Sequence, residues 1–108
     1  MTRITIYKSN NDEIVGFRAS GHSGYAEAGS DIICAAISTL VTNTVNSIES
    51  FTNDAFDCEV DEKTAIVTLR LKSEASSECA VLLKAFELGV TSIAMDNSKY
   101  ISVSFEEV

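Results

Sequence analysis

The sequence predicts an α+β domain with two layers, in which one sheet is covered by two helices. Short segments with alternating apolar and polar residues, typical of half-buried strands, flank two longer segments whose apolar residues recur at helical spacing. Their order is strand-strand-helix-strand-strand-helix-strand, and such layers pack around one hydrophobic core. We expect a single domain over residues 1–108, because this length suffices for one core and no proline or linker divides it.

Residues 2–8 form the first predicted strand, because Ile4 and Ile6 alternate with polar neighbours. Polar turn residues follow at 9–12, and the alternation then resumes as far as Ala19. Together these features predict a hairpin at the start of the chain.

Helical spacing begins at Asp31 and continues to about Phe51. Ser30 or Asp31 is the predicted N-cap, because either side chain can accept hydrogen bonds from amides of the first turn. This start places Cys34 in the first turn of the helix. The apolar stripe of the helix consists of Ile33, Ile37, Leu40, Val41, Ile48 and Phe51.

A second hairpin is predicted from residues 56–60 and 67–71, which are joined by a polar turn at 61–64. Cys58 shares one strand face with apolar neighbours. Because free cysteine is among the most often buried residue types, we expect Cys58 in the core.

The second helix is predicted over residues 73–88, with Cys79 on its apolar face and Gly89 as its C-terminal break. A short helical turn at 90–95 and a last strand at 101–105 complete the chain.

The composition limits the class of partner. Acidic residues outnumber basic ones 16 to 8, which gives a formal charge of −8. This balance argues against direct binding to nucleic acid and allows a basic protein or peptide as partner, although acidity can also serve solubility alone.

Three cysteines without a Cys-x-x-Cys motif suit a reducing compartment. The longest apolar run, Ile32 to Ile37, is far too short to span a membrane, and no apolar signal core follows Met1. We therefore expect a soluble, cytoplasmic protein without membrane contact.

One segment carries the residues most suited to chemistry. His22, the only histidine, lies twelve residues before Cys34, and Gly21, Gly24 and Gly29 give this segment backbone freedom. A thiol in the first turn of a helix lies where unpaired amides and the helix dipole favour its anion. A loop that can bring an imidazole onto such a thiol is typical of a cysteine nucleophile with its base.

Other interpretations of these residues stay open from the sequence. Cys34 can be a small residue that lets the helix approach the sheet, and His22 can be a surface residue. A zinc site is disfavoured, because one histidine and one cysteine do not complete a ligand set and adding Glu27 and Asp31 is ad hoc. A phosphate site is disfavoured, because the segment has acidic residues and no lysine or arginine lies between Arg18 and Lys63. We expect neither a metal nor a cofactor.

The chain resembles the ribosomal-processing cysteine protease family, called Prp, in two adjacent stretches of this segment. They are Gly21-His22-Ser23-Gly24-Tyr25-Ala26-Glu27 and Gly29-Ser30-Asp31-Ile32-Ile33-Cys34-Ala35-Ala36-Ile37-Ser38. The resemblance implies a small bacterial cysteine endopeptidase that removes the N-terminal extension of a large-subunit ribosomal protein, the twenty-seventh of that series, in Firmicutes and their relatives. It also implies a homodimer and catalytic roles for Cys34 and His22.

In the mechanism that we expect, His22 takes the proton of Cys34 and the thiolate attacks the scissile carbonyl. Amides of the first helical turn, including that of Cys34, are candidate oxyanion donors. Asp31 is the candidate orienting residue, with helix capping as its alternative. Ser38 lies one turn beyond Cys34, where it can support the thiol or bond the carbonyl four residues back.

The same glycines, Gly21, Gly24 and Gly29, predict a gate over residues 21–30 that closes on the site when substrate binds. An ordinary glycine-rich loop is the alternative. A second class of function also stays open, namely a non-catalytic module that binds a peptide or takes part in ribosome assembly, in which Cys34 only packs.

Overall fold

The computed structural model describes residues 1–20 and 28–108, with side chains from Ile32 onward in the second range. Within these ranges lie five strands and two helices. In chain order they are β1 (Thr2–Lys8), β2 (Ile14–Ser20), α1 (Ala28–Phe51), β3 (Phe56–Asp61), β4 (Ile66–Leu71), α2 (Ser77–Asp96) and β5 (Ile101–Glu107).

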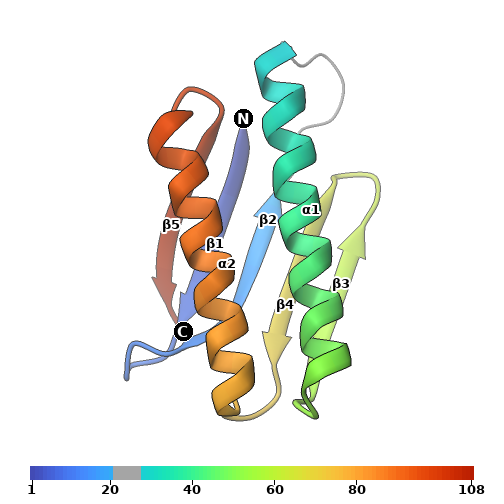
Figure 1. The fold of residues 1–108 in the computed structure, drawn as a ribbon, viewed down its shortest axis with the longest axis vertical. Coiled ribbons are helices and arrows are strands. Elements are labelled where there is room, and N and C mark those ends of the chain that lie inside the picture. The colour runs from blue at the N-terminus through green and yellow to red at the C-terminus, as the bar shows by residue number, and fades with distance from the viewer. Residues whose placement is uncertain (21–27) are drawn as a thin grey trace.

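The strands form one sheet in the order β3-β4-β2-β1-β5. Neighbouring strands are antiparallel, except that β1 and β5 run parallel. Both helices lie on the same face of the sheet and run side by side (Figure 1). The predicted two-layer α+β fold and its order of elements are confirmed.

The core lies between the helices and the sheet. Ile6 of β1 pairs with Phe17 of β2, which in turn pairs with Leu69 of β4, and all three are fully buried. The Phe17 ring stacks on Phe86 of α2 with 4.2 Å between ring centroids. This continuous apolar layer holds the helices to one face. The helices contribute Ile33, Ile37, Val41 and Ile48 from α1, and Cys79, Leu83, Phe86 and Val90 from α2.

Gly89 lies inside α2, where the sequence predicted a break. The helix begins after its N-cap, Ser76, and continues without interruption to Asp96. A methyl group at Gly89 would lie 3.2 Å from a terminal carbon of Leu40 in α1. The predicted break was wrong, because this glycine permits close contact between the two helices instead of ending one of them.

α1 begins at Ala28, three residues before the predicted start, so neither Ser30 nor Asp31 is its N-cap. Acidic and hydroxyl residues are favourable inside the first turn as well as at the cap, because the helix dipole attracts negative charge there. Their presence therefore does not distinguish the two starts. Gly29 is helical, and Cys34 lies in the second turn of α1 instead of the first.

The prediction that Cys58 is buried was also wrong. Cys58 pairs with the core residue Leu69, so it does lie on the face that carries the helices. It is nevertheless exposed, and Val60 on the same strand is 62% exposed. Five strands about 4.8 Å apart make a layer about 24 Å wide, whereas two packed helices cover only about 20 Å. The edge strand β3 remains largely uncovered as a result.

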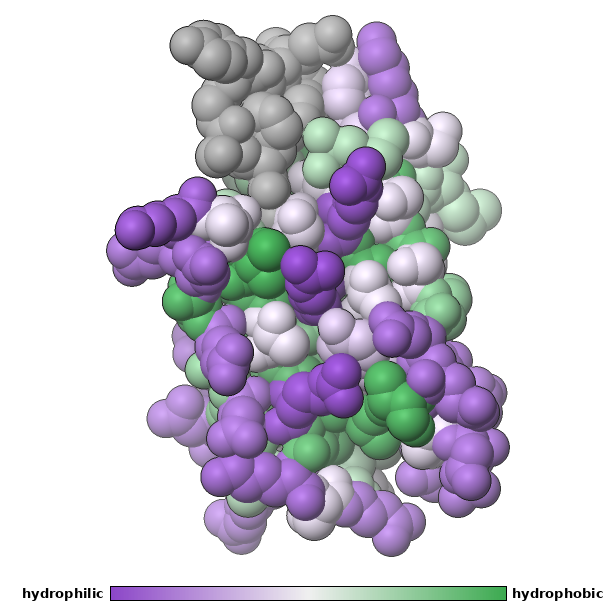
Figure 2. Space-filling model, turned by 180° about the vertical axis from the view of Figure 1, so that it is seen from behind, coloured by the Kyte–Doolittle hydropathy of each residue, from purple (hydrophilic) through white to green (hydrophobic). Residues whose placement is uncertain are grey.

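The opposite face of the sheet carries no helix in the part of the chain that the structure describes. Figure 2 shows this face, where hydrophilic and hydrophobic side chains are mixed. Arg70 covers Tyr7 here, with its guanidinium 3.9 Å from the ring centroid, and Tyr7 is buried as a result.

α1 resembles a membrane-spanning helix in length and composition alone. The segment Ile32–Phe51 has a mean hydropathy of 1.2. In the structure this segment packs on the sheet and on α2, with Ile33, Ile37 and Val41 in the core. A core helix of a folded domain meets the same criterion, and this packing accounts for the buried apolar residues, whereas Ile32 and Phe51 at the two ends of the segment are exposed.

Candidate active site

Cys34 borders a cavity of about 280 Å³ between α1 and the β3–β4 hairpin. Its side chain is partly exposed. Because Cα–Cβ bonds in a helix tilt toward the N-terminus, the Cα–Cβ bond of Cys34 leans toward the first turn of α1. The cavity is lined by Thr2, Ala19, Cys34, Ile37, Ser38, Val41, Thr42, Val60, Asp61, Glu62, Ala65 and Val67.

The uncovered edge of the sheet creates this cavity. Ile37 and Val41 of α1 are buried and form one wall. Val60 of β3 and Val67 of β4 pair across the hairpin and form the facing wall. The cavity is thus a mainly apolar space beside a thiol, large enough to receive one amino-acid side chain.

The turn between β3 and β4 brings carboxylates to the same cavity. Asp61 Oδ1 accepts hydrogen bonds from the amides of Lys63, at 3.0 Å, and Thr64, at 3.3 Å. Glu62 follows and is exposed. Ala65 has a φ of 55°, in the left-handed region that strains residues other than glycine. The cavity is therefore bordered by negative charge and by a strained turn.

Cys79 is a structural thiol, as predicted from its place on the apolar face of its helix. It is fully buried, and burial, followed by the charge and hydrogen bond of Asp54, raises its pKa to about 11. Asp54 accepts hydrogen bonds from the amide and the hydroxyl of Ser76, at 2.7 and 2.6 Å, and these bonds lower the pKa of Asp54. This network holds the start of α2 and keeps Cys79 protonated.

Cys58 lies on the exposed edge strand, and desolvation raises the pKa of its thiol. It is absent from the lining of the Cys34 cavity. Among the three thiols, Cys34 combines partial exposure with a cavity that can hold a substrate group.

The structure brings together two of the predicted site residues. Ser38 lines the cavity one turn beyond Cys34. Gly29 and Asp31 belong to the first turn of α1. His22, together with Gly21, Gly24 and most of the predicted gate, lies outside the described residues.

The prediction for the oxyanion donors changes with the start of α1. The amide of Cys34 lies in the second turn, where backbone amides donate to carbonyls one turn earlier. It is therefore not one of the unpaired amides at the helix start, and the amides of residues 28–30 are the first-turn donors instead.

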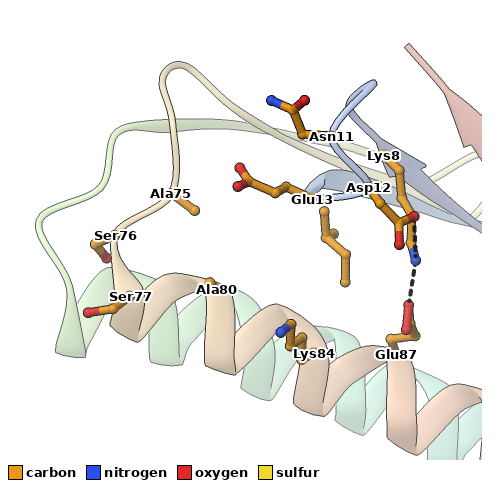
Figure 3. Close-up of a pocket in the computed structure, with 11 residues that line it drawn as sticks. Lys8, Asn11, Asp12, Glu13, Ala75, Ser76, Ser77, Ala80, Lys84 and Glu87 are labelled. Carbon is orange, nitrogen blue, oxygen red and sulfur yellow. Dashed lines mark ion pairs between the residues drawn. The ribbon is translucent and has the colours of Figure 1, made fainter.

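A larger hollow of about 600 Å³ lies at the other end of the helices, between the β1–β2 turn and the start of α2 (Figure 3). Lys8 crosses it, with Nζ 3.4 Å from Asp12 Oδ1 and 3.3 Å from Glu87 Oε1. Desolvation opposes the charge of Lys8, but the hydrogen bond and charge of Glu87, with a further contribution from Asp12, raise its pKa. The residues that line this larger hollow include neither cysteine nor histidine, so its greater volume does not make it the reactive site.

A partly exposed thiol near the start of a helix, beside a cavity for a side chain, supplies the nucleophile and the substrate space that a cysteine hydrolase requires in addition to its base. The model of the family "Cysteine protease Prp" matches residues 1–102. The chain therefore belongs to the Prp family of cysteine proteases.

Two curated relatives support this assignment. The ribosomal processing cysteine protease Prp of Staphylococcus aureus (strain Mu50) is 24% identical over 105 residues, which are 95% of this chain and 99% of that protein. The Prp of Bacillus subtilis (strain 168) is 35% identical over 48 residues, so the match spans 44% of this chain and only 43% of that protein. A crystal structure of S. aureus Prp in complex with a substrate peptide is similar with a TM-score of 0.92 and 20% identity, over 98% of this chain and 100% of that one. At this identity the structural likeness establishes the fold.

Proposed function

We propose that this chain is a cytoplasmic cysteine endopeptidase that removes the N-terminal extension of a large-subunit ribosomal protein, the twenty-seventh of that series. The observation that carries the proposal is the position of Cys34 beside a mainly apolar cavity, within a sequence segment that resembles the Prp signature. The family assignment and the substrate-peptide complex of the S. aureus relative support a peptide substrate.

In the proposed reaction, His22 takes the proton of the Cys34 thiol, and the sulfur forms a bond to the scissile carbonyl carbon. Collapse of this intermediate breaks the C–N bond, and His22 returns the proton to the leaving amine. Water then hydrolyses the thioester, which releases the carboxylate product and restores the thiol. Ser38, which lines the same cavity, is a candidate support for the thiol, and Asp31 is the candidate orienting residue.

The charge distribution supports a basic substrate. The chain carries a formal charge of −8, and Asp61 and Glu62 border the cavity beside Cys34. Negative potential around a cleft raises the rate at which a cationic peptide encounters it. The predicted gate extended to residue 30, but Gly29 lies in α1, so a gate that confines cleavage to peptides that close it would be limited to the part of the segment before Ala28.

The decisive experiment incubates the purified precursor ribosomal protein with the wild-type chain and with Cys34→Ala, followed by mass spectrometry of the products. We expect one truncation with the wild type and none with Cys34→Ala. Cys58→Ala is the matched control, because Cys58 is also exposed but lies away from the cavity, and it should cleave as the wild type does. Cleavage by pure Cys34→Ala would overturn the proposal, as would an intact precursor after incubation with the wild type.

A further inference from the structure

β3 is one of the two edge strands of the sheet, and it borders the Cys34 cavity. Within the described part of the chain it pairs with β4 alone (Figure 1). All of its residues after Phe56 are exposed, including the apolar Val60. An edge strand presents a row of main-chain amides and carbonyls to which another extended chain can bind.

The register of the β3–β4 pair determines which main-chain groups point outward. Just beyond the ladder, the Lys72 amide donates to the Ala55 carbonyl at 3.0 Å. Bonded and non-bonded pairs alternate in an antiparallel ladder, so the acidic residues of β3 are those whose main chain bonds to β4. The main-chain groups that point away from β4 belong to Phe56, Cys58 and Val60. Within the described residues, no main-chain hydrogen bond from outside the sheet reaches them.

Two hollows of different character meet at this edge. On the helix side lies the mainly apolar Cys34 cavity. A second hollow, of about 500 Å³, includes residues of the opposite face of the sheet, which Figure 2 shows. It is lined by Arg18, Glu59, Val60, Asp61, Glu62, Ile66 and Thr68. Val60, Asp61 and Glu62 line both hollows, so the two are separated only by the end of β3 and its turn.

The second hollow is acidic, with three carboxylates and one guanidinium among its lining residues. Arg18, its only cation, forms no ion pair with Glu59 or Asp61 within the described residues, and Glu59 is exposed. At the other end of β3, by contrast, Asp57 lies 3.4 Å from Lys72 Nζ. The uncompensated negative charge is therefore at the end of β3 near Cys34, where it favours a basic side chain.

We propose that the substrate binds as an additional strand on the free edge of β3, with apolar side chains toward the Cys34 cavity and basic side chains, alternating with them, toward Glu59 and Asp61. The proposal rests on the proposed protease function, because it takes the bound peptide as the substrate. Successive residues of a strand point to opposite faces, so a peptide on this edge presents them in turn to the two hollows. The main chain of Cys58 takes part but its thiol does not, so Cys58→Ala keeps this edge intact.

The first test measures peptide binding to Cys34→Ala by NMR titration and amide hydrogen exchange. The probe is acetyl-Lys-Val-Lys-Val-Lys-Val-amide, and acetyl-Lys-Lys-Lys-Val-Val-Val-amide is a control of the same composition and charge. We expect the alternating peptide to bind about three- to tenfold more tightly. At saturation it should slow exchange of the Val60 amide about tenfold and leave residues 101–107 of the other edge strand, β5, unchanged. Equal affinities, or slowing confined to β5, would overturn the proposal.

N-methylated versions of the alternating peptide test strand addition directly. One version carries methyl groups on the three valine amides and another on the three lysine amides. Only every second residue of an added strand donates to β3, so one version should bind at least tenfold more weakly and the other within twofold of the parent peptide. The valine version is the sensitive one in antiparallel addition, and the lysine version in parallel addition. Equal losses for both would show that the peptide does not extend the sheet.

The acidic side is tested with Glu59→Gln in the Cys34→Ala protein. We expect it to bind the alternating peptide about two- to fivefold more weakly. Glu106→Gln is the matched control, because Glu106 is exposed on β5 and pairs with Tyr7 on the same face of the sheet, so it should bind as the parent does. The same affinity for Glu59→Gln and Glu106→Gln would contradict the proposed direction of the basic side chains.

These measurements need no cleavage, so they separate this proposal from the protease function. Slower exchange at Val60 supports strand addition even where the precursor ribosomal protein stays intact. Unchanged exchange at Val60 overturns strand addition even where the wild type cleaves the precursor.

Discussion

Selective alkylation of the three cysteines is the sharpest consequence of the structure. A thiol reacts as its thiolate, so both pKa and access determine the rate. Cys79 is fully buried and has a pKa of about 11, raised first by burial and then by Asp54. At pH 7.5 about 0.03% of such a thiol is ionised, compared with about 10% of an ordinary cysteine with a pKa near 8.5. Ionisation alone therefore slows Cys79 about 300-fold, and its burial slows it further.

Cys58 occupies an intermediate position. It is exposed on β3, but desolvation raises its pKa, so its alkylation should be slower than that of an ordinary surface cysteine and much faster than that of Cys79. Cys34 should be the fastest of the three if it is the nucleophile, because His22 then assists its ionisation. The predicted order is Cys34, then Cys58, then Cys79.

The measurement is a time course with iodoacetamide at pH 7.5, followed by digestion and mass spectrometry. Trypsin leaves Cys34 and Cys58 in one peptide, because no lysine or arginine lies between them, so a protease that cleaves after glutamate, at Glu49, is required. In urea the three rates should converge. Labelling of Cys79 in the folded protein within tenfold of Cys58 would refute the reasoning on burial, and labelling of Cys34 more slowly than Cys58 would refute its role as nucleophile.

Three further predictions concern the base, the substrate and the assembly. His22→Ala should lower turnover about a hundredfold or more without a change in Tm, since a positioned base contributes on this scale; an unchanged pH–rate profile would show that another group is the base. Cleavage of a basic peptide should slow as ionic strength rises from about 0.05 to 0.5 M. Glu62→Gln should weaken this dependence, whereas Glu74→Gln, away from the cavity, should leave it as it is. A homodimer should give a light-scattering mass of twice 11.6 kDa. Val81, Leu88 and Met95 recur every seven residues and are exposed on α2, so this helix face is the candidate dimer contact. Leu88→Glu should therefore yield the monomer. A wild-type mass of 11.6 kDa would contradict it.

The alternation of apolar residues was sufficient to predict the strands, because it depends only on which face of a strand is buried. The burial of Ile6 and Phe17 follows from it, and helical spacing in the same way placed Cys79 on the buried face of α2. The boundaries of the helices were predicted wrongly because they depend on neighbouring elements. Glycine is typical of helix ends, and only the proximity of Leu40 in α1 explains why Gly89 lies inside α2.

The site was predictable only in part, for a related reason. Cys34 could be selected from the sequence because it lies near the start of an apolar helix and follows a segment with glycine and histidine. Thr2 and Val67 could not be assigned to the same cavity, because they lie 32 and 33 residues from Cys34 and meet it only through the order of the strands. Alternation places Thr2 on the buried face of β1, but nothing in the local sequence shows that this end of β1 borders a cavity beside Cys34.

The wrong prediction for Cys58 and the presence of the cavity have the same physical origin. Two helices are narrower than five strands, so the apolar face of β3 extends beyond α1 and leaves Val60 uncovered beside Cys34. An exposed edge strand invites pairing with other chains, and alternate residues of β3 are acidic, which opposes such pairing between copies of the same charge. Those carboxylates would at the same time attract a basic peptide. The residues of β3 that face the helices are apolar and the residues that alternate with them are acidic, so this edge is suited to receive a cationic segment next to the thiol. A third helix packed on β3 would have covered the exposed edge and filled the pocket.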